Sequence, residues 1–135
     1  MEYKDINYFI LKEFEGIYQI YDSVEHIEAC TTFINEMYET YLMRYTTYKK
    51  MLKKRLGITK KYPLYLHDDL FFIRFDLDDE IIYVNYSKVF SMDYNDKVLS
   101  IVFKNGFKLI KKTSYYVYKQ AMLRFMKLYQ YVKDM

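Results

Sequence analysis

The sequence predicts one α+β domain over residues 1–135, with an N-terminal hairpin, a long amphipathic helix, a small mostly antiparallel sheet and a C-terminal helix. Two periodicities indicate this class. Apolar residues recur at spacings of three and four in two segments, and they form short β-branched or aromatic runs elsewhere. The length of 135 residues is near the commonest domain size, and no segment rich in Pro, Gly or Ser divides the chain.

The first element is a predicted β-hairpin. Residues 6–14 and 17–21 are apolar, β-branched or aromatic runs, and Glu15 and Gly16 separate them. Two such runs joined by a short glycine-containing turn are typical of a hairpin.

A single long helix is predicted after this hairpin. Ser23 is its expected N-cap, and Gly57 is expected to end it. Cys30 lies on the apolar stripe, so we expect it to be a small buried hydrophobe. If the stripe exceeds what one domain can cover, the surplus surface forms a homodimer. The stripe consists of Ile27, Cys30, Ile34, Met37, Tyr38, Tyr41, Tyr45, Tyr48 and Leu52.

A run of strands and a last helix are predicted after Pro63. Asn105-Gly106 predicts a type I′ hairpin turn, because these residue types adopt positive φ angles readily. Thr113 or Ser114 is expected to cap a final helix that extends to about Lys133. The expected strands are residues 64–66, 70–75, 81–84, 98–103 and 107–110.

Charge is arranged in blocks along the chain. Residues 1–43 hold nine acids and two bases, and residues 44–61 hold eight bases and no acid. Residues 68–80 hold six acids and one base, and residues 81–135 hold ten bases and three acids. A formal net charge of +3 hides this pattern. Block-like charge is typical of a partner surface.

The basic block is the candidate binding site of the sequence. Cations near a helix C-terminus stabilise the helix by about 0.3–1 kcal/mol without any ligand, which explains part of the block. Eight cations without an acid exceed that need, and crowded like charges repel one another, so a polyanionic partner explains the block better. The candidate DNA-binding residues are Arg44, Lys49, Lys50, Lys53, Lys54, Arg55, Lys60 and Lys61.

The sequence contains no recognisable catalytic or metal-binding pattern, and we expect a protein that is not an enzyme. His26 and His67 are far apart in the sequence, and we expect His67 in a solvated turn with its neighbouring aspartates. The acids of residues 76–80 lack the spacing and the glycine of a calcium loop, so we expect a charged turn there. Three glycines are too few for a nucleotide-binding loop, so no cofactor and no small-molecule substrate are expected.

Cys30 is the single cysteine, which excludes an internal disulfide. The first thirty residues lack the basic start and the apolar run of a signal peptide. No apolar stretch approaches the roughly twenty residues of a membrane helix. We therefore expect a cytoplasmic protein without a membrane partner.

Several short segments carry a family resemblance. They are Lys61-Tyr62-Pro63-Leu64, Leu70-Phe71-Phe72, Ile81-Ile82-Tyr83-Val84-Asn85, Val89 and Phe103-Lys104-Asn105-Gly106. In order and spacing these segments resemble the ComK family of competence transcription factors of Gram-positive bacteria. In that family a Lys-x-Pro-Ile segment precedes a Phe-Phe strand, a Trp-Ile strand, a hairpin and a closing helix. The resemblance covers about residues 44–132.

The chain departs from the family pattern at several places. The family's Phe-Phe-Pro-Thr reads Phe71-Phe72-Ile73-Arg74 here, and its Gly-Ser-Ser-Tyr-x-Gly-Arg segment reads Tyr41-Leu42-Met43-Arg44. Cys30 matches a family cysteine only if an insertion is allowed. The resemblance implies sequence-specific binding to paired A/T-rich boxes by a homo-oligomer and activation of DNA-uptake genes. It also implies control by a regulatory protein partner that directs proteolysis.

The leading hypothesis from the sequence is a DNA-binding transcriptional regulator that recognises A/T-rich double-stranded DNA. Narrow minor grooves of such DNA concentrate negative potential and attract Arg and Lys. One alternative is a small protein-interaction or inhibitor module that docks through the acidic residues 1–43 and 68–80 or through the basic surface. Another is a single-strand binder that uses exposed members of its 18 Tyr and 10 Phe, most of which we expect in or beside the core.

Overall fold

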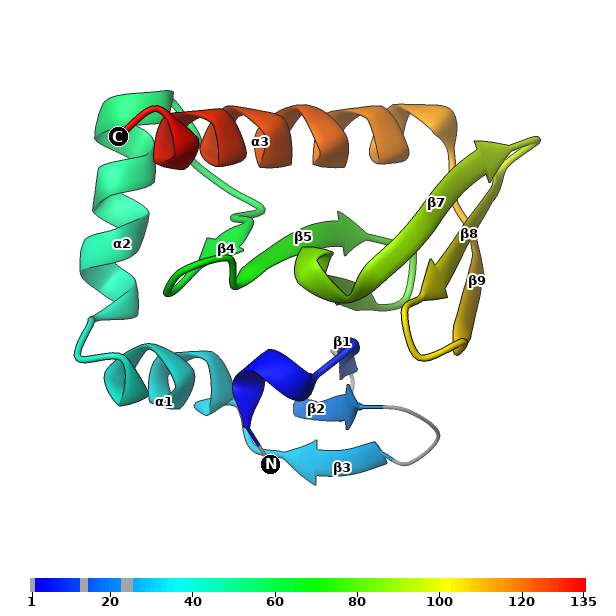
Figure 1. Cartoon of the computed structure of the whole chain (residues 1–135), viewed down its shortest axis with the longest axis horizontal. Helices are drawn as coiled ribbons and strands as arrows, with labels where there is room; N and C mark the ends of the chain where they lie inside the picture. Colours follow the sequence, from blue (N-terminus) through cyan, green and yellow to red (C-terminus); the bar gives the residue numbers. More distant parts are fainter. Residues whose placement is uncertain (1, 13–14, 23–25) are drawn as a thin grey trace.

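The computed structural model describes residues 2–12, 15–22 and 26–135 (Figure 1). Its centre is a six-stranded antiparallel sheet with the strand order β3-β2-β1-β6-β5-β4, and a three-stranded sheet β7-β8-β9 stands beside it. The strands are β1 Tyr8–Lys12, β2 Ile17–Tyr21, β3 His26–Ala29, β4 Leu64–Tyr65, β5 Phe71–Asp76, β6 Ile81–Asn85, β7 Val89–Asn95, β8 Val98–Phe103 and β9 Lys108–Lys112. The predicted α+β class is confirmed.

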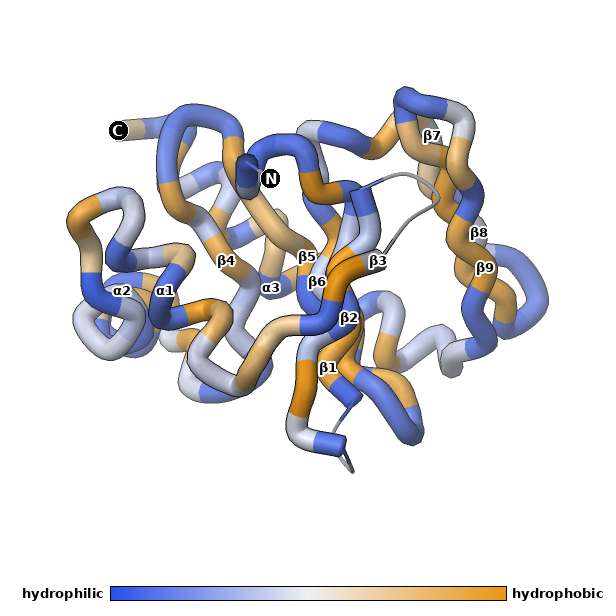
Figure 2. Tube along the Cα trace, turned by 90° about the horizontal axis from the view of Figure 1, so that it is seen from below, coloured by the Kyte–Doolittle hydropathy of each residue, from blue (hydrophilic) through white to orange (hydrophobic). Residues whose placement is uncertain are grey.

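The N-terminal hairpin joins the large sheet through a pairing between distant parts of the chain. β1 pairs with β2, as the sequence predicts, and its other edge pairs with β6, where Phe9 lies opposite Tyr83. Both faces of β6 are covered, because all five of its residues are buried. Figure 2 shows the hydrophobic strands of this sheet near the centre of the molecule.

Helices cover the two faces of the large sheet. α3 (Tyr115–Lys133) lies on one face, where Phe125 meets Phe71 edge-on at 6.0 Å. α1 (Phe33–Thr40) lies on the other face, where Phe33 meets Phe9 edge-on at 5.1 Å. α2 (Tyr45–Met51) continues into η2, a turn of π-helix at Leu52–Leu56. The two remaining short turns are η1 (Tyr3–Asp5) and η3 (Tyr86–Lys88).

The prediction of one long helix from residue 24 to residue 57 is wrong. Residues 26–29 form β3, in which Ile27 pairs with Ile20, and the helical part is split into α1 and α2. Leu42 separates them with a φ of 60°, a left-handed conformation that no α-helix can contain. The expected end at Gly57 is confirmed by its φ of 69°. Ser23, the expected N-cap, lies outside the described residues.

The tight turns of the small sheet differ from the prediction. Asn105 does not adopt a positive φ, and only Gly106 does, at 89°, so the predicted type I′ turn at this position is wrong. The amide of Gly106 donates to the carbonyl of Phe103 at 2.8 Å, which closes a turn of three loop residues. The two-residue loop with two positive φ angles lies between β7 and β8 instead, at Asp96 (50°) and Lys97 (64°).

The last helix agrees closely with its prediction. Ser114 caps α3 by accepting a hydrogen bond from the amide of Val117 at 3.2 Å, and Ala121, Phe125 and Leu128 are buried beneath it. None of the helices in the described ranges is both long and apolar enough to cross a membrane.

Candidate nucleic-acid interface

Two anchors fix which side of α2 and η2 faces outward. Tyr48 and Leu52 are buried, and the Tyr48 hydroxyl donates to the carbonyl of Pro63 at 2.6 Å. Residues on the other sides of this helical segment therefore point away from the core. We call its cations the basic face, which consists of Lys49, Lys50, Lys53, Lys54 and Arg55.

The basic face places like charges next to each other. Lys49 and Lys53 are four residues apart, as are Lys50 and Lys54, which makes them neighbours on the helix surface. Each such pair destabilises a helix by about 0.2–0.5 kcal/mol. Within the described ranges none of these five cations forms an ion pair with a carboxylate. The segment therefore carries a repulsion that folding does not relieve.

Lys49 is the member of the basic face that contacts aromatic rings in the described part of the chain. Its ammonium lies 4.7 Å from the ring centre of Tyr45 and 5.9 Å from that of Tyr62. The sequence analysis missed both rings as parts of the site, although the spacing of four between Tyr45 and Lys49 is a detectable signal. Burial raises the pKa of Tyr45 to about 12, so its hydroxyl stays neutral and does not offset the cations.

The structure places the other three predicted site residues around the ends of this helix. Arg44 is the exposed N-cap residue of α2, and Lys60 and Lys61 lie in the loop after Gly57. The contact between Lys49 and the Tyr62 ring brings that loop beside the helix. Lys61 is half-buried and Lys60 is exposed, so the loop adds one fully exposed cation to the basic face.

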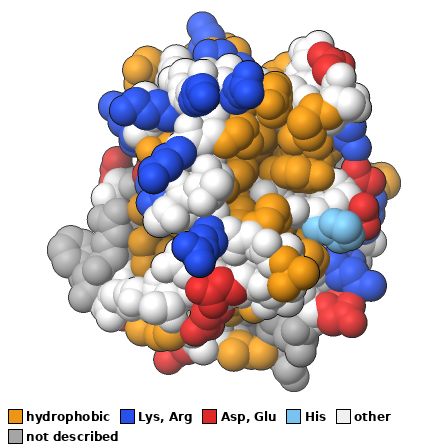
Figure 3. Space-filling model, turned by 90° about the vertical axis from the view of Figure 1, so that its left-hand side faces the viewer, with side chains coloured by type: hydrophobic (Ala, Val, Ile, Leu, Met, Phe, Trp, Pro, Cys, Tyr) orange, Lys and Arg blue, Asp and Glu red, His pale blue; other side chains and the backbone are white. Residues whose placement is uncertain are grey.

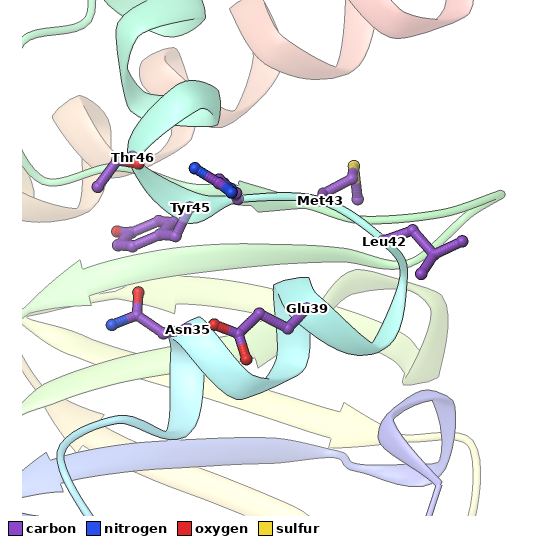
Figure 4. A pocket seen from close by; sticks show the side chains of 7 residues that line it. Asn35, Glu39, Leu42, Met43, Tyr45 and Thr46 are labelled. Carbon is purple, nitrogen blue, oxygen red and sulfur yellow. The ribbon is translucent and has the colours of Figure 1, made fainter.

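A hollow of about 600 Å³ lies between α1 and the start of α2 (Figure 4). Glu39 and Asn35 reach into it from α1, and Tyr45 lies on its α2 side. Leu42, whose side chain is 96% exposed, stands at its rim. Arg44 also lines the hollow, but it forms no ion pair with Glu39 or any other carboxylate of the described ranges.

Figure 3 views the molecule from the side of α1 and α2. Lys and Arg side chains follow one another along one side of this face, and a hydrophobic area lies beside them. Several Lys and Arg side chains are thus gathered on this accessible surface. A polyanion that lies along α2 would contact several of them at once.

The acidic block 68–80 is largely engaged in the fold. Asp69 pairs with Lys133, Asp76 accepts two hydrogen bonds from Arg74, and buried Glu80 lies between Lys12 (2.8 Å) and Lys111 (2.6 Å). The predicted solvated turn at residues 67–69 is confirmed, since all three side chains are exposed. In the described ranges no group of acids, histidines and Cys30 is arranged to hold a metal ion.

The prediction that Cys30 is buried is wrong. Its side chain is exposed, because the chain leaves β3 at this residue and does not enter a helix. A hydrogen bond with the hydroxyl of Thr32, with the sulfur and oxygen 2.9 Å apart, lowers the pKa of the thiol.

Comparisons with known proteins identify no relative. No protein-family model, no curated protein and no solved structure matches this chain.

Proposed function

We propose that this protein is a ComK-like transcriptional regulator that binds A/T-rich double-stranded DNA through the basic face of α2 and η2. The observation that carries the proposal is a set of exposed helical cations without carboxylate partners in the described part of the chain. DNA phosphates would relieve the mutual repulsion of these cations and release condensed counterions.

The choice of duplex DNA over an acidic protein rests on the regular spacing of the charges. A helix that lies along a groove meets phosphates at regular intervals, and cations at spacings of three and four form a continuous ridge. Phosphate contacts supply affinity and orientation but no base readout. The preference for A/T-rich sequence and the assembly into a homo-oligomer come from the family resemblance alone.

The alternative of a protein-interaction module through the acidic surface has less support. Three of the six acids of residues 68–80, Asp69, Asp76 and Glu80, pair with Lys or Arg of this chain. Asp68 contacts only His67, and Asp78 and Asp79 are exposed without an ion pair in the described ranges. The alternative therefore rests mainly on exposed acids of residues 1–43, such as Glu28 and Glu39, which form no ion pair in the described ranges.

The experiment is a salt titration of binding to a fluorescent A/T-rich duplex, measured by anisotropy. Six of the eight candidate cations are exposed. If all six contact phosphates, log Kd should change with log salt with a slope of about 5. Replacing Lys50, Lys53, Lys54 and Arg55 together with Gln should reduce the slope by about 3 to 4.

A matched variant controls for net charge. Lys108, Lys112, Lys119 and Lys127 are equally exposed and lie on β9 and α3. Their replacement by Gln removes the same charge but should leave most of the slope unchanged. Equal effects of the two quadruple variants, or no duplex binding at low salt, would refute the proposal.

A further inference from the structure

Two adjoining hollows lie around η3, and none of their lining residues belongs to the basic face. One of about 510 Å³ lies between η3, the start of β7 and the end of α3, and another of about 670 Å³ lies between η1, η3 and the β8–β9 turn. Ser87 and Lys104 line both hollows, so the two lie next to each other. We call the two hollows together the η3 groove.

One half of the η3 groove is aromatic. Tyr86 is 40% exposed and packs with its ring centre 4.9 Å from that of Phe125 and 5.4 Å from that of Tyr129. Phe90 lines the same hollow with 74% of its side chain exposed. A largely exposed phenylalanine in the same hollow as a tyrosine that packs on two other rings offers ring faces to a planar ligand.

The other half of the η3 groove is basic. Lys4, Lys88 and Lys104 line it, with Asp5 as the acid among the lining residues. Lys4 pairs with Glu2 at 3.2 Å, whereas Lys88 and Lys104 form no ion pair in the described ranges. At the aromatic end, the single aspartate, Asp69, is neutralised by its hydrogen bond from Lys133.

Buried amides hold the walls of the η3 groove in place. Asn85 is fully buried, donates to the carbonyl of Ile6 at 2.8 Å and accepts from the hydroxyl of Ser87 at 2.8 Å. Asn7 donates to Asn105 at 3.3 Å, and the amide of Lys104 donates to the carbonyl of Lys88 at 2.8 Å. Three segments distant in the sequence are thereby fixed together, so a ligand would meet a preformed site.

We propose that the η3 groove binds a short segment of single-stranded nucleic acid. Unpaired bases stack on Phe90 and Tyr86, and the backbone phosphates lie against Lys88 and Lys104. A duplex does not fit this chemistry, because its bases are stacked on one another and cannot cover a protein ring. The inference is independent of the proposed duplex binding, since the two sites share no residue.

The test measures anisotropy of a fluorescent short oligothymidylate with the full chain. Phe90→Ser should weaken binding by about tenfold to a hundredfold, because base–aromatic stacking contributes on that scale. Phe90→Tyr should retain binding, since it keeps a ring. Lys104→Gln should weaken binding and lower its salt dependence, as expected for a phosphate contact.

Ile110→Ser supplies the matched control. Ile110 is 62% exposed on β9 and lines neither hollow, so its loss should leave single-strand affinity unchanged. The proposal is overturned if Phe90→Ser binds oligothymidylate as well as the wild type does. It is also overturned if Ile110→Ser loses as much affinity for oligothymidylate as Phe90→Ser does. Competition by thymidine monophosphate at the same concentration as the oligomer would overturn the assignment to a strand in favour of a free nucleotide.

Duplex binding separates this proposal from the proposed function. Phe90→Ser should leave the affinity for the A/T-rich duplex unchanged. The quadruple variant of the basic face should lose duplex affinity but still bind the single strand. Adding Phe90→Ser to that variant should still weaken its single-strand binding. Loss of both activities on Phe90→Ser, with the thermal transition intact, would overturn the separation of the two sites.

Discussion

The segment α2–η2 and the helix α3 differ in how many of their cations the fold engages. Five cations occupy the twelve residues of α2–η2, and none of them contacts a carboxylate in the described ranges. Four cations occupy the nineteen residues of α3, where Lys133 pairs with Asp69 and Arg124 is half-buried. Burial lowers the pKa of Arg124.

The N-caps of the two helices also differ: that of α3 stabilises its helix, and that of α2 does not. Ser114 caps α3 with its hydroxyl, whereas Arg44 at the N-cap of α2 makes no capping hydrogen bond and places a cation at the positive end of the helix. The Ser114 cap and the buried Ala121, Phe125 and Leu128 fix α3 to the fold. α2–η2 is held by Tyr48 and Leu52 although the cation at its N-cap and its like-charged neighbours oppose the helix, which is the pattern expected where selection acts on binding.

The largest effect should come from the core beneath α3. Phe125 is 3% exposed and contacts the rings of Phe71, Tyr86 and Tyr129. Phe125→Ala should lower the free energy of unfolding by about 3–5 kcal/mol, as measured by urea denaturation. The quadruple variant of the basic face should cost no stability in the same assay. A larger loss from that variant than from Phe125→Ala would contradict the comparison.

A paired carboxylate should give a pH-dependent effect of intermediate size. Burial raises the pKa of Glu80, but hydrogen bonds from Lys111 and Lys12 outweigh it and hold the pKa below the ordinary value of 4.5. The resulting stabilisation is complete above pH 4.5 and is lost as the pH falls through the lower, folded pKa.

Glu80→Gln should therefore lower stability at neutral pH by about 1.5–3 kcal/mol and flatten the pH dependence below 4.5. Denaturation series across pH would measure both effects. Glu39→Gln, at an exposed position, serves as the control and should change neither. An unchanged acid limb in Glu80→Gln would show that this carboxylate is not the group that titrates.

The helix caps should give smaller effects of opposite sign. Ser114→Ala should destabilise the fold by about 1 kcal/mol, because it removes a capping acceptor. Arg44→Ser should stabilise the fold by up to about 1 kcal/mol, because it supplies a cap and removes a cation from the helix N-terminus. Arg44→Ser should also reduce the salt slope of duplex binding by about 1. Destabilisation by both substitutions would remove the contrast between the helices.

The smallest effect should come from one charge on the basic face. Lys50→Glu replaces a repulsive pair with an attractive one toward Lys54, four residues later, and should stabilise the fold by about 0.5 kcal/mol. The same substitution should weaken duplex binding. Thermal unfolding measures the expected gain in stability, and fluorescence anisotropy measures the expected loss of duplex affinity. Lys119→Glu on α3 should leave duplex affinity nearly unchanged, and a matching loss there would indicate a general charge effect.

The sequence by itself determined the features that depend on near neighbours. The spacing of apolar residues predicted α3, Thr113 or Ser114 marked its start, and Gly57 identified the end of η2, because caps and periodicity are local properties. The basic block was visible because no acid interrupts residues 44–61. The hairpin and five later strand runs were visible because β-branched and aromatic residues cluster in them, whereas β3 and β7 were not predicted.

Only the tertiary structure decided features that depend on distant partners. Ile27 fits a helical stripe equally well, yet it pairs with Ile20 because a sheet edge was available there. The pairing of β1 with β6, the burial of Asn85 against Ile6 and the η3 groove join segments roughly 80 residues apart. A local sequence pattern does not encode such contacts. The free energy of burial depends on side chains that are far apart in the sequence and meet only in the folded chain.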